Sequence, residues 1–243
     1  MHDPAYARSL GFAGGIVPGV DVYAYLTRPV VELWGAGWLG GGGMDVRFLK
    51  PVYDNDLLVI EASADGDEEL RLEAKKEDGE IAATGLASLH PTVTVPRVGA
   101  YEVRPLPDPP PAAEEAAFRA RPVLGSLELT VSAEDAARQL AEVGEQLDIY
   151  ARDGVVHPGH LLRLADRILL DNFELPPWMH VSSSPRNFAM ARVGERLSVR
   201  ANLVELFERN GHRFVQLDVL VVGSQGPVVR VMPYTAIYRP AFG

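Results

Sequence analysis

The sequence repeats the same pattern of helix-start and strand residues after a shift of 140 residues. Pro18-Gly19 falls on Pro158-Gly159, and Phe48 falls on Phe188. In each half, a helix candidate that begins at the Pro-Gly pair is followed by a series of strand-like runs. Self-similarity at a fixed offset is typical of a structural unit that occurs twice in one chain. We therefore predict an internal duplication within the 243 residues.

Each predicted unit consists of one long helix and a set of strands. The first unit has a helix over 15–35 and strands over 44–48, 57–63, 70–76 and 80–89. The second has a helix that begins at 157 and strands over 180–188, 197–207, 213–222 and 227–238. A helix that packs on one face of an antiparallel sheet gives the α+β class. Two such units would pair their sheets about a pseudo-twofold axis, as the subunits of a homodimer do, and would share a cleft.

A proline-rich segment separates the two units. Seven of the 19 prolines lie between 96 and 122, and they include Pro109-Pro110-Pro111. The residue before a proline is pushed out of the helical region, which is typical of an extended linker. We therefore predict a first unit at 1–95, a linker at 96–124 and a second unit at 125–243.

Composition excludes several kinds of partner. The 23 Lys and Arg against 33 Asp and Glu give a net charge of −10. A chain this acidic lacks the excess of positive charge that binds a phosphate backbone. The chain has no cysteine, which excludes disulfides, thiolate metal sites and cysteine nucleophiles. No run approaches the roughly 18 apolar residues of a membrane span, and the N-terminus lacks a signal-peptide pattern. We expect a cytoplasmic protein with neither a membrane nor a nucleic-acid partner.

The first half contains four short motifs. They are HDPAYA at 2–7, GF at 11–12, GIVPG at 15–19 and VRFLKPVYD at 46–54. Together they resemble the MaoC-like hotdog family, which includes the (R)-specific enoyl-CoA hydratases and acyl dehydratases. The resemblance implies a hotdog fold, and the duplication makes it a double hotdog. It also implies an acyl-thioester substrate, most often of coenzyme A, whose acyl chain enters between the long helix and the sheet.

The hydratase motif of the first half is incomplete. Hydratases of that family carry an Asp and a His close together in a loop before the helix, and commonly a second His at the helix entry. The resemblance places His2 at the loop position, although no Asp precedes it in this sequence. Pro18 stands where the second His would be. We keep His2 and its neighbour Asp3 as candidate catalytic residues.

The second half carries a different motif. His157, Gly159 and the Leu-Ala-Asp run that ends at Asp166 have the spacing found in the phenylacetate-pathway type of hotdog thioesterase, with Pro158 in place of one Gly. In that family the helix Asp acts on the attacking water or on the thioester carbon. The resemblance implies this role for Asp166, and we also keep His157 as a catalytic candidate.

Four further residues are candidates for binding the substrate. The amides at a helix N-terminus attract a polarised carbonyl oxygen, and Gly19 and Gly159 begin the two predicted helices without a side chain in the way. Trp178 precedes a predicted strand and could line the acyl channel, and Asn187 lies at the end of that strand. At the 140-residue shift, Asp166 faces the apolar Leu26, which predicts that one cleft is more active than the other.

No metal or cofactor is expected. His157 and His160 could meet on one helix face, but no third ligand with a supporting pattern lies nearby in the sequence. The favoured function is a hydratase or dehydratase that adds water to, or removes it from, an acyl-CoA or related thioester by general acid–base catalysis. A thioesterase that uses Asp166 and a non-catalytic acyl-thioester-binding subunit remain as alternatives. Homo-oligomers could form through further sheet pairing.

Overall fold

The computed structural model describes residues 3–9 and 11–241. In the first half the elements are α1 (Pro4–Ser9), α2 (Gly19–Gly41), β1 (Gly43–Phe48), β2 (Leu58–Ala64), β3 (Glu69–Lys76) and β4 (Ile81–Ser88). The middle of the chain forms α3 (Glu115–Ala120), β5 (Leu127–Thr130), α4 (Ala133–Glu142) and α5 (Asp148–Asp153). The second half continues with α6 (Pro158–Asn172), β6 (Met179–Asn187), β7 (Arg196–Arg209), β8 (His212–Gly223) and β9 (Gly226–Arg239).

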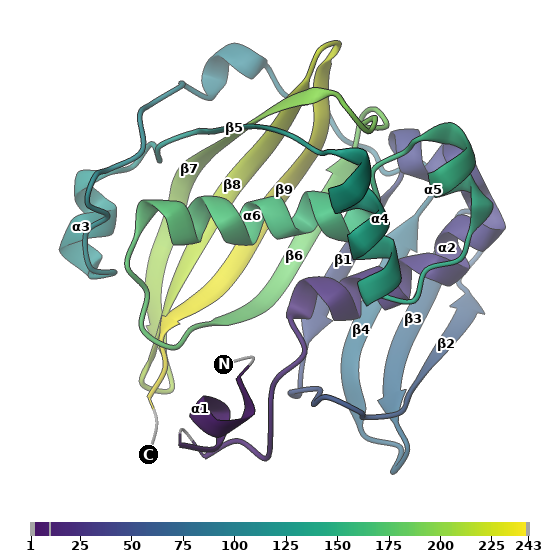
Figure 1. Cartoon of the computed structure of the whole chain (residues 1–243), viewed down its shortest axis with the longest axis horizontal. Coiled ribbons are helices and arrows are strands. Elements are labelled where there is room, and N and C mark those ends of the chain that lie inside the picture. The colour runs from purple at the N-terminus through teal and green to yellow at the C-terminus, as the bar shows by residue number, and fades with distance from the viewer. Residues whose placement is uncertain (1–2, 10, 242–243) are drawn as a thin grey trace.

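In the described part of the chain, nine strands form one antiparallel sheet in the order β2-β3-β4-β1-β6-β9-β8-β7-β5. The sheets of the two halves join edge to edge between β1 and β6, so that they form a continuous surface. The long helix α6 crosses the strands of the second half, and α2 lies with the strands of the first half (Figure 1). The α+β class and the pairing of two helix-bearing sheets are therefore confirmed.

The seam between the two halves obeys the predicted repeat. Val46 pairs with Ser183, and Gly43 pairs with Arg186. A shift of 140 residues converts one of these pairs into the other, as a twofold axis through the seam requires. Register in a sheet is fixed by side-chain pattern and packing on both strands. The two halves have therefore kept equivalent patterns at the place where they meet.

The first long helix continues beyond its predicted end at 35. Gly35 has a non-helical backbone (φ 52°, ψ −134°), and α2 bends there before it runs on to Gly41. The glycine run at 40–43 ends this helix and starts β1. Trp38 lies in the extension and is fully buried. Burial of this large apolar ring favours the extra turns despite the low helix propensity of glycine.

The proline-rich segment packs against the sheet as well as connecting the halves. Tyr101 is buried beside Leu220 and Val222, in a small cluster separate from the main core. Its hydroxyl lies 3.0 Å from both carboxylate oxygens of Asp218, which also receives hydrogen bonds from Arg230. Side chains alternate between the two faces of a strand. The segment therefore covers the sheet face opposite to the one that carries α6.

The two long helices meet closely on the other face. A Cβ atom added to Gly159 would lie only 2.8 Å from the Cβ of Ala24 on α2. Small residues at a crossing let two helices approach each other. Near this contact, Arg163 of α6 forms an ion pair with Asp21 of α2. The helix contact and the β1–β6 pairing fix the two halves relative to each other, and residues of both halves share one apolar core.

Candidate functional site

A cavity of about 480 Å³ lies where the first helix of one half meets the helix and sheet of the other. The start of α2, the middle of α6, the end of β1 and the start of β6 contribute to its walls. Most of its side chains are apolar or aromatic, and examples are Phe12, Val17, Phe48, Leu170, Trp178 and Ile237. An apolar cavity with a few polar groups is typical of a site for a largely hydrophobic ligand.

Asp166 brings a carboxylate to this cavity. It lies on the buried side of α6, and its side chain keeps 13% of its surface exposed. Its Oδ1 accepts a 2.9 Å hydrogen bond from the hydroxyl of Tyr234. Burial, together with the charge of Asp166, raises the pKa of Tyr234 well above its ordinary value, so this hydroxyl stays protonated and donates. Within residues 3–9 and 11–241, no hydrogen bond uses Oδ2 of Asp166.

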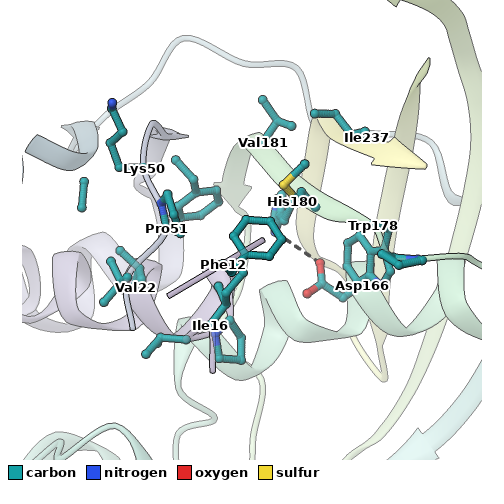
Figure 2. Close-up of a pocket in the computed structure, with 18 of the residues that line it drawn as sticks. Phe12, Ile16, Val22, Lys50, Pro51, Asp166, Trp178, His180, Val181 and Ile237 are labelled. Carbon is teal, nitrogen blue, oxygen red and sulfur yellow. Dashed lines mark ion pairs between the residues drawn. The ribbon is translucent and has the colours of Figure 1, made fainter. Parts of the chain in front are cut away.

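His180 lies beside this carboxylate, and Figure 2 shows the side chain of Asp166 directed toward it. Nδ1 of His180 is 3.2 Å from Oδ1 of Asp166, but the angle between them is outside the hydrogen-bond range, which leaves Nδ1 without a hydrogen-bond partner among the described residues. Nε2 is 2.6 Å from Oγ of Ser183. The imidazole also contacts the rings of Phe48 and Tyr234, with centroids 4.9 and 4.6 Å away.

The N-terminus of α2 lies at the wall of the same cavity. Pro18 precedes the helix and offers no side-chain cap, and the first amide that bonds back to its carbonyl is that of Asp21. The N–H groups of Gly19 and Val20 are therefore unused by the described part of the chain. Gly19 lines the cavity, and a Cβ atom there would lie 3.2 Å from the ring of Phe48. This close approach leaves little room for a side chain.

The predicted catalytic role of His157 does not fit its position. The residue caps the N-terminus of α6, where its Nδ1 accepts a 3.0 Å hydrogen bond from the amide of Gly159. Only 2% of its surface is exposed, and it does not line the cavity. Burial lowers the pKa of His157, against the opposing effect of Glu145, whose Oε2 is 3.8 Å from Nε2. His157 therefore stabilises the helix end as a neutral imidazole.

Gly159 and Asn187, two of the predicted substrate-binding residues, also lie away from the cavity. Gly159 lies at the helix crossing, and the side-chain amide of Asn187 donates a 3.0 Å hydrogen bond to the carbonyl of Trp38. Asn187 thus joins the end of α2 to β6 across the seam. In contrast, Gly19 and Trp178 line the cavity, and their role in substrate binding stays a prediction.

The N-terminal candidates give little support to the hydratase site. Asp3 is exposed and accepts a 2.7 Å hydrogen bond from the amide of Tyr6, which caps the short helix α1. His2 lies outside the described residues. Tyr6 and Phe12 of the same segment do line the cavity, so the motif that resembles a hydratase loop lies at its wall.

The duplication has left only one half with this polar group of side chains. At the 140-residue shift, Asp166 corresponds to Leu26 and His180 to Gly40, and Leu26 is fully buried. Sequence comparison between the halves predicted the Asp–Leu difference, whereas it did not link His180 with Asp166. The partnership depends on a helix and a strand that meet only in the fold.

Two kinds of feature are absent from the described residues. Among them, no group of three or more His, Asp or Glu side chains is arranged to hold a metal ion. None of the described helices is long and apolar enough to cross a membrane.

Comparisons with known proteins support the fold. No family model matches the sequence, and no curated protein matches it significantly. A proposed MaoC domain dehydratase from Chloroflexus aurantiacus is 13% identical, with a TM-score of 0.64 over 98% of this chain and 86% of that one. A double hotdog protein of Mycobacterium tuberculosis is 17% identical, with a TM-score of 0.62 over 97% and 86%. A proposed thioesterase from Novosphingobium aromaticivorans is 14% identical, with a TM-score of 0.56 over 93% and 89%. The chain therefore has the double hotdog fold.

Proposed function

We propose that this protein hydrolyses an acyl thioester and that Asp166 activates the water. The observation that carries the proposal is that Asp166 and Gly19, whose N–H is unused by the described part of the chain, line the same apolar cavity. Apolar walls suit an acyl chain, a carboxylate suits a general base, and helix amides suit the carbonyl oxygen. Proteins of similar fold that are described as thioesterases or dehydratases lend support to a thioester substrate.

The proposed reaction uses Oδ2 of Asp166 as the base. It takes a proton from water while the water oxygen forms a bond to the thioester carbon. The N–H group of Gly19 and the positive end of α2 stabilise the negative charge that develops on the carbonyl oxygen. The carbon–sulfur bond then breaks, and Asp166 returns the proton to the sulfur. The products are a carboxylic acid and a free thiol, and the carboxylate is regenerated.

This proposal changes the order of the alternatives that the sequence suggested. The hydratase interpretation relied on His2, Asp3 and His157, and the described residues do not bring such a group together. The thioesterase interpretation relied on Asp166, which does line the cavity. The change therefore follows from where the side chains lie, since both readings share the fold and the substrate class.

A panel of acyl-CoA substrates tests the proposal directly. Short, medium, long and aromatic acyl groups would be incubated with the protein, and the free thiol would be measured with a colorimetric reagent. Because the chain contains no cysteine, the protein adds no thiol of its own. We expect thiol release from at least one member of the panel, and no release from any member would contradict the proposal.

Hydration of an enoyl thioester is the second candidate, and one observation favours it. His180 lies beside Asp166, so two groups able to transfer protons occur together. In hydration, the water oxygen bonds to the β-carbon and a proton is added to the α-carbon, while the thioester stays intact. Loss of enoyl absorbance without thiol release would identify this reaction. Thiol release, from an enoyl or a saturated acyl-CoA, would identify hydrolysis.

A further inference from the structure

The strand that carries His180 contains an irregularity beside the site. His180 pairs with Ala236 on β9, and Ser183 pairs with Tyr234. His180 and Ser183 are three positions apart on β6, whereas their partners on β9 are only two positions apart. The extra residue is Val181, which makes a β-bulge. In a regular strand, residues three apart point to opposite faces. The bulge brings His180 and Ser183 to the same face, and bulges next to active sites commonly redirect a side chain in this way.

Ser183 is placed to hold the imidazole rather than to react with a substrate. Its Oγ lies 2.6 Å from Nε2 of His180, and only 1% of the residue is exposed. Ser183 is not among the residues that line the cavity, so its hydroxyl cannot reach a thioester carbon there. The Asp–His–Ser order resembles a catalytic triad, but Ser183, at the position of the nucleophile, is buried away from the cavity.

The neighbouring carboxylate decides which imidazole nitrogen carries the proton. Nδ1 of His180 is 3.2 Å from Oδ1 of Asp166, and the negative charge of a carboxylate so close favours a proton on this nitrogen even without a well-aligned hydrogen bond. The proton is therefore favoured on Nδ1, and Nε2 is left as an acceptor for the hydroxyl of Ser183. The two imidazole nitrogens have distinct roles, and the partner of one fixes the state of the other.

We propose that Ser183 is a positioning residue: its hydroxyl donates to Nε2 of His180 and holds Nδ1–H beside Oδ1 of Asp166, which leaves Oδ2 of Asp166 to act on the substrate. The last step rests on the proposed function, whereas the arrangement of Ser183 and His180 does not. Tyr234 contributes from the opposite strand, because its hydroxyl donates to the same Oδ1. Ser183, through His180, and its cross-strand partner Tyr234 thus fix Oδ1 of Asp166 and leave Oδ2 free.

Nuclear magnetic resonance of the imidazole nitrogens tests the arrangement without turnover. The whole protein would be labelled with ¹⁵N, and the His180 signals would be assigned by their loss in His180→Gln, at a pH where the imidazole is neutral. We expect the proton on Nδ1. In Ser183→Ala the Nε2 signal should move toward that of an imidazole nitrogen without a hydrogen bond. Ser183→Thr keeps a hydroxyl and should restore the signal, and Ser184→Ala is the control on the adjacent residue.

Kinetics separate this inference from the proposed function. Ser183→Ala should lower kcat by roughly 10- to 100-fold through misplacement of the base, with little change in KM. A proton on Nε2 in the wild type, or an unchanged Nε2 signal in Ser183→Ala, overturns the inference even if thioesters are hydrolysed. The expected signals in a protein that turns over no thioester would leave the positioning intact and refute the proposed function.

Discussion

The hydroxyl of Tyr234 donates a 2.9 Å hydrogen bond to Oδ1 of Asp166, and it joins β9 to α6. The carboxylate is mostly buried and has few other partners. A hydrogen bond to a charged group contributes about 1.5–3 kcal/mol. This bond therefore both stabilises the fold and sets the direction of the proposed base.

Tyr234→Phe should weaken both properties. We expect a loss of about 1–3 kcal/mol in the free energy of unfolding and a fall of at least tenfold in kcat, because Oδ1 loses its donor. Urea unfolding and steady-state kinetics would measure the two effects. Tyr150→Phe is the matched control, because the buried hydroxyl of Tyr150 has no hydrogen-bond partner among the described residues. Equal effects of the two substitutions would show that the bond to Asp166 has no special role.

The two helix-entry glycines should respond differently to alanine. In Gly159→Ala the new methyl group would press on Ala24 at the helix crossing, and we expect a loss of about 1–3 kcal/mol of stability with kcat retained. In Gly19→Ala the methyl group would press on the ring of Phe48, which contacts His180. We expect that variant to lose activity with a smaller loss of stability. Thermal unfolding and kinetics on both variants test this contrast, and a reversed pattern would place the carbonyl-binding amides at the N-terminus of α6 and contradict the assignment to α2.

His157 should matter for stability and little for turnover. His157→Ala removes the cap of α6 and leaves a small cavity, so we expect a loss of about 2–4 kcal/mol. Asparagine is a good N-cap residue, and His157→Asn should recover part of that loss. Both variants should keep a kcat near the wild-type value under conditions in which they are folded. A variant that folds as well as the wild type but has lost turnover would restore His157 as a catalytic residue.

Acidification should destabilise the protein partly through His160. Burial is the main cause that lowers the pKa of this imidazole to about 4, with a further contribution from Arg163. Between that value and its ordinary pKa of about 6.5, the unfolded chain binds more protons than the folded one, so stability falls as the pH falls. The contribution is complete above pH ~6.5 and amounts to roughly 1–3 kcal/mol.

Comparison of the wild type with His160→Gln isolates this effect from that of other groups. Urea unfolding at neutral pH and near pH ~4.5 would give the change in stability for each protein. We expect a smaller loss on acidification for the variant. An equal loss in both proteins would show that His160 does not titrate differently on folding.

Local patterns predicted the architecture well, because strands and helix entries are marked by neighbouring residues. The 140-residue repeat even predicted the relation that the β1–β6 seam obeys. The end of α2 was less predictable, since Gly35 interrupts the helical backbone and the burial of Trp38, which favours the extra turns, is visible only in the fold.

The site was predicted in part for the same reason. Asp166, Gly19 and Trp178 belong to recognisable local patterns and do line the cavity. Tyr234 lies 68 residues from Asp166, and Ser183 reaches His180 only because of the bulge. No local pattern marks either contact. His157 matches a catalytic motif in sequence, yet it caps α6. A His two residues before Gly159 can either face a substrate or accept the hydrogen bond of the Gly159 amide, and the sequence does not distinguish the two.

The most direct test compares two aspartates on one helix. Asp166 lines the cavity, whereas Asp171 is an ion-pair partner of Arg167 near the end of α6. With an acyl-CoA that the wild type hydrolyses, we predict that Asp166→Asn lowers kcat for thiol release by at least about 100-fold while Asp171→Asn leaves it within about twofold. Wild-type thiol release from a folded Asp166→Asn protein would contradict the account.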